Sequence, residues 1–517
     1  MTYKLKEKWI HTLENTAYYA SLLDFIEADQ WHEALNGTLD FGTGGMRGHL
    51  GPGENRINHL TIRKVVFSYA KTLKQNDLII IGYDTRHFSY EFALDCAKVL
   101  IDHGIRVKVF KYPRPTPECS FAIRHFNAQG GIMITASHNP KTDNGIKLYD
   151  ENGCQFTPDK VLLIQEHFKS ITNLFDLEIL GNFTHRMDWI DEDFDDIYLM
   201  TIQTLTYNPT DAKVSILYSP LQGTGYRIMP RVFDGKNVTL DVLDIQMSQD
   251  PNFTNTPCLN PEKRESFEGL LKENENHDLL VVSDPDCDRL GVMVHHQNSY
   301  HLLSGNQLGI LFLDYIAKFS KKKTIINTIV TTDYTKKLVD HYKLNHIQTL
   351  TGFKYIGETI ETIDNDDFLF GFEESNGYLF GDFVRDKDAV QAMWVLAEMT
   401  QYYKTHNKTL LDALHDLHLQ FGPWFDAQIS IPMDAHEIED VMNTLRDQPN
   451  IIDYLKDTPL PKENVLKLYF DKGWIVLRPS GTEALCKVYY YAEDKKTLDA
   501  LILETNHLLQ KKDQRHG

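Results

Sequence analysis

The sequence predicts an α/β fold of three consecutive α/β layered domains and a C-terminal α+β domain around a central cleft. Short apolar runs rich in β-branched residues alternate with stretches of helical periodicity, which is typical of layered domains with largely parallel strands. At 517 residues the chain is too long for a single core. From about Phe421 the alternation gives way to separated strands and helices. We therefore expect domains at 1–200, 201–303, 304–420 and 421–517.

The first domain is predicted to begin with an amphipathic helical arm and to continue as alternating strands and helices. Apolar residues at helical spacing define the arm from Leu5 to about Leu35. The segments that follow are predicted strands at 78–81, 107–110 and 131–134 and predicted helices at 90–103 and 118–126.

Between the arm and the first strand lies a glycine-rich loop, 41–48, that carries the cation Arg47. It is a poor dinucleotide fingerprint, because Arg47 occupies the third glycine position and no strand precedes the loop. Close approach of its backbone to a phosphate is the functional interpretation, and a plain flexible loop is the alternative.

The alternation restarts twice after an acidic connecting stretch near 191–196. The predicted elements of the later domains are strands at 214–218, 279–282, 324–330 and 473–477 and helices at 223–233 and 304–316. Each restart indicates a further α/β unit, and each unit ends a strand in a distinctive polar loop.

The composition narrows the possible partners and the compartment. The chain has 53 Lys and Arg against 73 Asp and Glu, a net charge of −20, which argues against a nucleic-acid or anionic-membrane surface. Its first residues lack the apolar core of a signal peptide, and no apolar run is long enough to span a bilayer, so we expect a cytoplasmic protein. Six scattered cysteines without a C-x-x-C pair favour reduced thiols over disulfides or zinc.

Three carboxylates, Asp284, Asp286 and Asp288, follow the predicted strand at 279–282. Alternate residues of an extended chain point the same way, so the three can converge on one cation, and oxygen ligands favour Mg²⁺. An EF-hand is excluded, because Arg289 stands at the sixth position and His295 at the twelfth. A solvated acidic turn is the alternative.

Ser137, in the loop 135–140 after another predicted strand, is the candidate nucleophile. Its surroundings form neither G-x-S-x-G nor S-x-x-K. A turn closed by side-chain hydrogen bonds is the alternative, but beside a carboxylate metal loop a serine that carries phosphate is the sharper interpretation.

Two further loops offer ligands for a phosphorylated sugar. Arg478, Ser480, Gly481 and Thr482 combine a guanidinium, two hydroxyls and a small residue, which suits a phosphate; an ordinary turn is the alternative. Glu373 and Ser375 supply acceptors and a donor for sugar hydroxyls.

Together these loops resemble the four active-site loops of the α-D-phosphohexomutase superfamily, in the same order. The matching segments are 135–140, 284–289, 371–375 and 478–483. The loop 41–48 and the segment 351–354 further resemble the phosphoglucomutase branch of bacterial PgcA type, related to the animal phosphoglucomutase-2 enzymes. Asn376 departs from the pattern, which favours a bulkier apolar or aromatic residue there.

The resemblance implies that Ser137 is a phosphoserine that completes a Mg²⁺ shell with Asp284, Asp286 and Asp288. Arg289 and Arg47 would lie near the transferring phosphoryl group, and His138, Lys147 and Lys354 would serve proton transfer and charge stabilisation. Glu373 and Ser375 would bind the sugar, and Arg478, Ser480, Gly481 and Thr482 the phosphate that does not react.

The resemblance also implies an activity: glucose 1-phosphate and glucose 6-phosphate interconvert through glucose 1,6-bisphosphate in a monomer or weak homodimer. Phosphomannomutase and phosphopentomutase activity are alternatives by the same mechanism. A Mg²⁺-dependent phosphatase of the haloacid-dehalogenase type, with Asp284 as nucleophile, is a more remote enzyme alternative. A catalytically silent sugar-phosphate sensor is the alternative that is not an enzyme.

Overall fold

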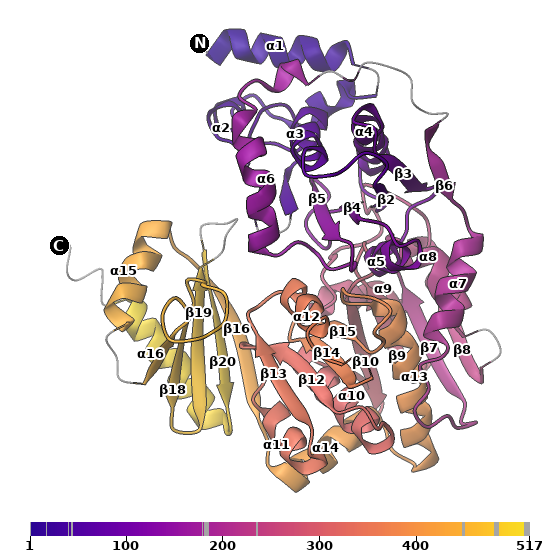
Figure 1. Cartoon of the computed structure of the whole chain (residues 1–517). Coiled ribbons are helices and arrows are strands. Elements are labelled where there is room, and N and C mark those ends of the chain that lie inside the picture. Colours follow the sequence, from indigo (N-terminus) through magenta and orange to yellow (C-terminus); the bar gives the residue numbers. More distant parts are fainter. Residues whose placement is uncertain are drawn as a thin grey trace.

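A computed structural model describes residues 2–510 except 17, 40, 43–44, 178, 180–185, 234–235, 365, 447–449 and 480–484. The described chain forms four β-sheets in succession along the sequence, each covered by helices (Figure 1). The predicted class, three α/β units and a final unit with a different sheet, is confirmed. The last sheet is antiparallel throughout, whereas the first three mix parallel and antiparallel pairs.

The first sheet carries the serine loop. Its order is β1-β5-β4-β2-β3-β6, with parallel pairing from β4 to β6 and antiparallel pairing at β5 and β1. The strands are β1 (Gly45–His49), β2 (Leu78–Tyr83), β3 (Arg106–Phe110), β4 (Gly130–Ile134), β5 (Asp143–Asp150) and β6 (Asp188–Ile190). The helices are α3 (His59–Ala70), α4 (Ser89–Asp102), α5 (Thr116–His125) and α6 (Pro158–Ser170).

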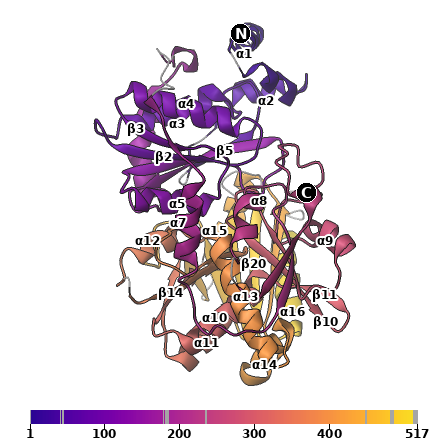
Figure 2. The ribbon, with the colours of Figure 1, turned by 90° about the vertical axis from the view of Figure 1, so that its right-hand side faces the viewer.

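Helices α3 and α4 lie on one face of this sheet and α5 on the other (Figure 2). The predicted arm forms α1 (Thr2–Glu14), a 3₁₀ helix (Ala20–Phe25) and α2 (Trp31–Asn36), with Trp9 buried against Leu60. The predicted glycine-rich loop is in part a strand, because Gly45–His49 pair with β5 as β1. Thr43 and Gly44 lie outside the described residues.

The second sheet, ordered β11-β10-β9-β7-β8, carries the metal loop between β9 and β10. Its strands are β7 (Val214–Ser219), β8 (Val238–Val242), β9 (Leu279–Ser283), β10 (Leu290–His296) and β11 (Ser299–Leu302). Nearby are α7 (Asp193–Ile202), α8 (Gly225–Ile228), α9 (Glu268–Glu273) and 3₁₀ turns at Met229–Arg231, Asp244–Gln246 and Arg264–Phe267. The 3₁₀ turn Leu174–Asp176 belongs to the first unit, where Leu174 is buried with Trp9 and Leu60. One continuous helix over 223–233 was a wrong prediction: α8 ends after one turn, where Pro230 lacks an N–H donor and a 3₁₀ turn takes over.

The third and fourth sheets complete the chain. The third, ordered β13-β12-β14-β15, comprises β12 (Thr324–Thr328), β13 (Asn345–Thr349), β14 (Phe368–Glu373) and β15 (Gly377–Leu379). Its helices are α10 (Gly305–Phe319), α11 (Tyr334–Tyr342), α12 (Phe353–Ile360), α13 (Ala389–Thr405) and α14 (Leu410–Phe421). The fourth, ordered β16-β20-β19-β18-β17, comprises β16 (Phe425–Pro432), β17 (Ile451–Asp453), β18 (Leu466–Phe470), β19 (Gly473–Pro479) and β20 (Leu485–Ala492), with α15 (Ala435–Leu445) and α16 (Lys495–Gln510).

The largest apolar core runs through all four units. It begins at Leu78 in β2, includes the buried residues of β9 and α13, and ends at Tyr491 in β20. Smaller cores fill the outer face of the first sheet and the far sides of the second and fourth. The four units therefore pack on one another through apolar contacts as well as through the polar site.

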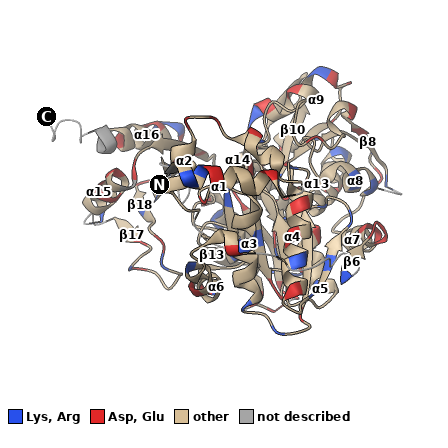
Figure 3. Cartoon of the chain, turned by 90° about the horizontal axis from the view of Figure 1, so that it is seen from above, with Lys and Arg blue, Asp and Glu red and all other residues tan. Residues whose placement is uncertain are grey.

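Seen from above, acidic and basic positions are interspersed along the helices (Figure 3). None of the described helices combines the length and the apolar character that crossing a bilayer requires.

Candidate active site

The metal loop turns between β9 and β10 and buries its three aspartates. One carboxylate oxygen from each of Asp284, Asp286 and Asp288 lies within 4.8 Å of the other two. Cys287 between them takes a left-handed backbone conformation, φ 55°, and packs into the core. The loop thereby turns its apolar residue inward and its carboxylates toward one point.

One oxygen of each aspartate accepts two hydrogen bonds or ion pairs from the surrounding protein. Asp284 Oδ1 accepts the backbone N–H groups of Asp288 and Arg289 at 3.1 and 3.0 Å. Asp286 Oδ2 accepts Thr116 Oγ1 and Lys147 Nζ, both at 2.9 Å. Asp288 Oδ2 accepts Lys387 Nζ at 2.8 Å and Lys147 Nζ at 3.3 Å.

The remaining oxygens fit a cation. Oδ1 of Asp286 and Oδ1 of Asp288 are buried and have no hydrogen-bond partner among the described residues, and Asp284 Oδ2 accepts Ser137 Oγ at 2.9 Å. Burial and the neighbouring carboxylates of Asp288 and Asp286 raise the pKa of Asp284 well above its ordinary range. Burial also acts on Asp286, but Lys147 and Lys387 outweigh it and lower its pKa. This donor set suits a hard divalent cation such as Mg²⁺.

The serine loop follows β4 and is held from behind by Arg86. Ser137 takes φ 52° and donates its N–H to Thr135 Oγ1 at 2.8 Å. The buried Arg86 guanidinium donates to the carbonyl oxygens of Ser137, Asn139 and Pro140 at 2.5–2.7 Å. Three acceptors on one planar cation fix the backbone that presents Ser137 Oγ.

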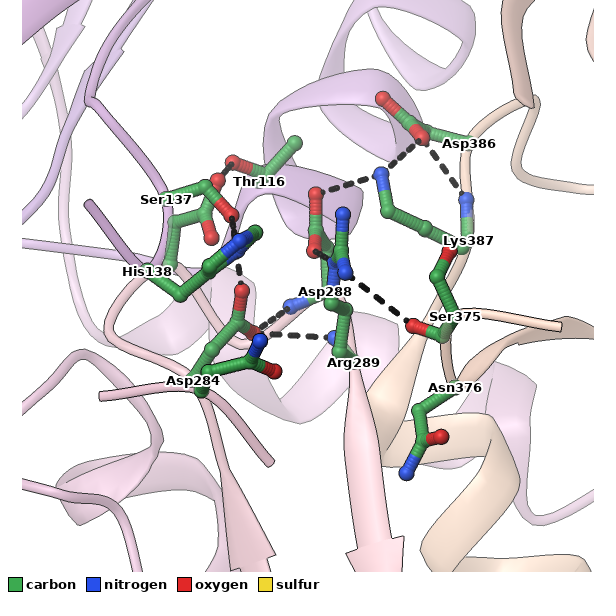
Figure 4. A network of polar contacts seen from close by, with 12 residues as sticks. Thr116, Ser137, His138, Asp284, Asp288, Arg289, Ser375, Asn376, Asp386 and Lys387 are labelled. Atoms are coloured by element: carbon green, nitrogen blue, oxygen red, sulfur yellow. Dashed lines mark hydrogen bonds and ion pairs between the residues drawn. The ribbon is translucent and has the colours of Figure 1, made fainter. Parts of the chain in front are cut away.

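Two predicted bases lie beside the serine and the aspartates. His138 Nδ1 lies 3.1 Å from Ser137 Oγ (Figure 4). Burial, then the charges of Arg289 and Arg47, lowers the pKa of His138 well below its ordinary value, so the ring is neutral at neutral pH. Lys147, on β5, bridges Asp286 and Asp288, and Arg47 lies on β1, which pairs with β5.

The sugar loop between β14 and β15 meets the metal loop at Arg289. One nitrogen of its guanidinium donates to Glu262 Oε1 at 2.9 Å and to the carbonyl of Ser375 at 3.2 Å (Figure 4). Glu373 accepts the N–H of Gly352 at 2.8 Å, which ties the sugar loop to the start of α12. Lys354 follows on that helix.

The phosphate loop is described only as far as its first residues. Arg478 is the last residue but one of β19. Burial lowers the pKa of Lys354 to about 8, and the charge of Arg478 contributes to this lowering. Ser480, Gly481 and Thr482 lie outside the described residues.

Sequence reasoning missed four residues of the site: Arg86, Thr116, Glu262 and Lys387. A signal existed for Lys387, because Arg385, Asp386, Lys387 and Asp388 form an unbroken charged run directly before an apolar helix, and all four are buried. Buried charges need partners, so such a run indicates a polar site. The other three are single residues in ordinary surroundings.

Comparison with known proteins identifies the family of this chain. Models of the four phosphoglucomutase/phosphomannomutase domains match in order: domain I at 38–175, domain II at 196–297, domain III at 304–419 and the C-terminal domain at 431–507. The chain belongs to the phosphoglucomutase/phosphomannomutase family.

Named relatives span nearly the whole chain. A phosphoglucomutase of Staphylococcus haemolyticus is 33% identical and one of Staphylococcus aureus 34%; each alignment covers 94% of this chain and 96% or 95% of the relative. A phosphoglucomutase/phosphomannomutase family protein of Burkholderia thailandensis shares the fold, with a TM-score of 0.71 at 17% identity over 91% of this chain and 97% of that one.

Proposed function

We propose that this chain is a phosphoglucomutase that interconverts glucose 1-phosphate and glucose 6-phosphate through phosphorylated Ser137 and glucose 1,6-bisphosphate. The observation that carries the proposal is the hydrogen bond from Ser137 Oγ to Asp284 Oδ2, at the point where three carboxylates converge. The relatives named phosphoglucomutase support the choice of glucose.

Asp284, Asp286 and Asp288 would hold Mg²⁺ through Oδ1 of Asp286 and of Asp288 and through Oδ2 of Asp284, which accepts the Ser137 hydroxyl. Bound there, the cation would neutralise charge on the phosphoryl group carried by Ser137. Lys147 binds Oδ2 of Asp286, and Lys387 binds Oδ2 of Asp288. The two lysines would thereby keep both aspartates ionised and oriented while the Oδ1 atoms bind the cation.

In the first half-reaction the bond between phosphorus and Ser137 Oγ breaks, and a new bond forms to a hydroxyl of the bound monophosphate. That hydroxyl loses its proton, and Ser137 Oγ takes one up as its bond to phosphorus breaks. In the second half-reaction Ser137 Oγ loses its proton as it attacks the other phosphate, and the sugar oxygen that is released takes one up. Phosphoryl transfer depends on placement and charge neutralisation, which Arg289, Arg47 and the lysines supply. We assign proton transfer and charge stabilisation to His138, Lys147 and Lys354.

The bisphosphate must reverse its orientation between the two half-reactions, so the site needs a second position that binds phosphate. We assign that place to Arg478, Ser480, Gly481 and Thr482, and the sugar hydroxyls to Glu373 and Ser375. Two distinct phosphate positions also explain why a bisphosphate would activate the enzyme: it phosphorylates Ser137 and leaves as a monophosphate.

The test compares kcat/KM for glucose 1-phosphate, mannose 1-phosphate and ribose 1-phosphate, each with Mg²⁺ and the matching bisphosphate. We expect a preference for glucose 1-phosphate. A preference for another sugar would keep the mechanism and change the substrate, release of free phosphate would favour the phosphatase, and binding without turnover the sensor.

Ser137→Ala should abolish turnover, because it removes the group that carries the phosphoryl, while the fold is kept. Circular dichroism and the unfolding midpoint check the fold, and the conversion of glucose 1-phosphate to glucose 6-phosphate measures turnover. Substantial mutase activity in this variant would overturn the assignment of Ser137.

A further inference from the structure

Thr116 connects the serine-bearing unit to the metal loop of the next unit. It is the first residue of α5 and is wholly buried. Its Oγ1 donates to Asp286 Oδ2 at 2.9 Å, and its backbone N–H donates to the carbonyl oxygen of Asp286, also at 2.9 Å. One residue thus holds both the main chain and the carboxylate of Asp286.

The start of α5 is built for this contact. Pro115 precedes Thr116 and has no side-chain donor or acceptor for a cap, so the first N–H of the helix is left for the Asp286 carbonyl. The positive end of the helix also favours the adjacent carboxylate. The helix therefore meets Asp286 with a fixed direction as well as with favourable charge.

Thr116 and Lys147 both donate to Asp286 Oδ2, but they have different effects on it. Lys147 supplies charge, but a flexible ammonium can follow a carboxylate that turns. The threonine hydroxyl sits on a buried helix and has one short bond, so it sets the angle of the carboxylate plane. With Oδ2 fixed in this way, Oδ1 is left buried and has no hydrogen-bond partner in the described part of the chain.

We propose that Thr116 is a positioning residue for the metal site, which selects the oxygen of Asp286 that binds Mg²⁺ and sets the serine-bearing unit in register with the metal loop. The inference rests on the proposed function only in that Asp284, Asp286 and Asp288 bind Mg²⁺. Thr116 acts through Asp286 and needs no contact with the sugar.

The experiment measures Mg²⁺ binding by isothermal titration calorimetry on the full chain without substrate, with the Mg²⁺ dependence of turnover as a second readout. Thr116→Val keeps the shape and removes the hydroxyl, and Thr116→Ser keeps the hydroxyl. We expect Thr116→Val to weaken Mg²⁺ binding about 10-fold or more, the usual effect of losing an outer partner of a metal ligand. Thr116→Ser should stay within about 3-fold of the natural protein, since its hydroxyl can still bind Oδ2.

A matched control separates this role from a general contact between units. Thr85 Oγ1 donates to the carbonyl of Gln222 at 3.0 Å, so it joins the same two units without a bond to Asp286. Thr85→Val should leave Mg²⁺ binding unchanged. Thr116→Ala provides the same loss of hydroxyl if the second methyl of valine prevents folding.

Three results would overturn the inference: natural affinity in both Thr116→Val and Thr116→Ala, equal losses in Thr116→Ser and Thr116→Val, or an equal loss in Thr85→Val. If the natural protein binds Mg²⁺ and the variants behave as expected but no sugar phosphate is isomerised, the proposed function fails and the inference stands. If the natural protein does not bind Mg²⁺, both fail.

Discussion

Asn376 shows how a departure from an expected residue can be a backbone requirement. It takes φ 64°, a left-handed conformation that asparagine adopts at lower cost than bulky apolar residues do. Its side-chain amide donates to the carbonyl of Leu290, and its own carbonyl accepts the N–H of Leu290, each at 3.1 Å. Asn376 thus fastens the sugar loop to the strand that follows the metal loop.

Asn376→Leu should therefore destabilise the fold by about 2–4 kcal/mol, through backbone strain and the unpaired carbonyl of Leu290. Urea unfolding measures this loss. Asn376→Gly is the control, because glycine adopts this conformation without strain and loses only the side-chain hydrogen bond. It should therefore lower the free energy of unfolding less than the leucine variant does. Equal stability of the leucine variant and the natural protein would contradict the role of the conformation.

Lys354 should set an upper pH limit on the reaction. Burial lowers its pKa to about 8, so the ammonium loses its proton as the pH rises through 8. We expect kcat/KM to fall above that pH, because the positive charge near the phosphoryl groups is lost. Lys354→Arg keeps its charge, so its residual activity should show no fall near pH 8. If kcat/KM of that variant still falls near pH 8, the fall is caused by the titration of another group.

At the scale of elements, the turn before α8 packs against the metal loop and supports it. Thr224 donates its N–H and its hydroxyl to the carbonyl of Pro285 at 2.8 and 3.0 Å. A Cβ on Gly223 would lie 2.3 Å from Pro285 Cα, so only glycine allows this approach. The first two residues of the predicted helix, Gly223 and Thr224, thus form a turn against the metal loop.

Gly223→Ala should push the metal loop away from its place and lower kcat/KM by about 10- to 100-fold, since displacement of a site by about 1 Å has effects of this size. Steady-state kinetics at several Mg²⁺ concentrations measures it. Gly269→Ala, in α9 of the same unit, is the control: the atoms nearest its Cβ belong to the side chains of Leu243, at 2.7 Å, and Gln246 rather than to the metal loop, so activity should be kept. Similar losses in both variants would argue against the loop contact.

The sequence predicted best the elements whose burial is purely apolar. The strands at 78–81, 131–134 and 279–282 were found because uninterrupted apolar runs fill them. Strand β5 was not, because it buries Asp143, Asn144 and Lys147, and their partners come from distant parts of the chain. Motif residues of the site, such as Ser137 and the three aspartates, were predictable, whereas Thr116 and Arg86 gain their importance only from packing.

At the scale of the whole molecule, polar contacts join the fourth unit to the third. Tyr355 donates to Glu463 at 2.7 Å, and Asn306 donates to Asp426 at 2.6 Å. Lys467 is buried over the ring of Trp474 and donates to the carbonyl of Ile329 at 2.8 Å. The unit that carries Arg478 is thereby seated on the unit that carries the sugar loop.

Lys467 should make this seating depend on pH. Burial lowers its pKa from 10.5 to about 8, with Asp333 and Lys336 as the nearest charges. Between pH 8 and 10.5 the unfolded chain binds this proton more than the folded one, so the contribution of Lys467 to the free energy of unfolding rises with pH, by about 3 kcal/mol in all.

Urea unfolding at pH 7.5 and pH 10 checks this for the natural protein and Lys467→Met. Buried tyrosines and cysteines with raised pKa values work in the opposite direction, but they are present in both proteins. We expect the change in unfolding free energy from the lower to the higher pH to be more favourable in the natural protein by about 2–3 kcal/mol. Identical pH dependence would exclude Lys467 as the cause.

The core shared by all four units also constrains how the chain is made. Ser120, on α5, accepts the N–H of Arg385, 265 residues further along, and Phe121 beside it packs against Phe383. At usual rates of synthesis the ribosome needs about 10–50 s to supply that partner segment. Until then α5 shows an apolar face to the cell, so the nascent first unit is a natural client for chaperones that bind apolar surfaces.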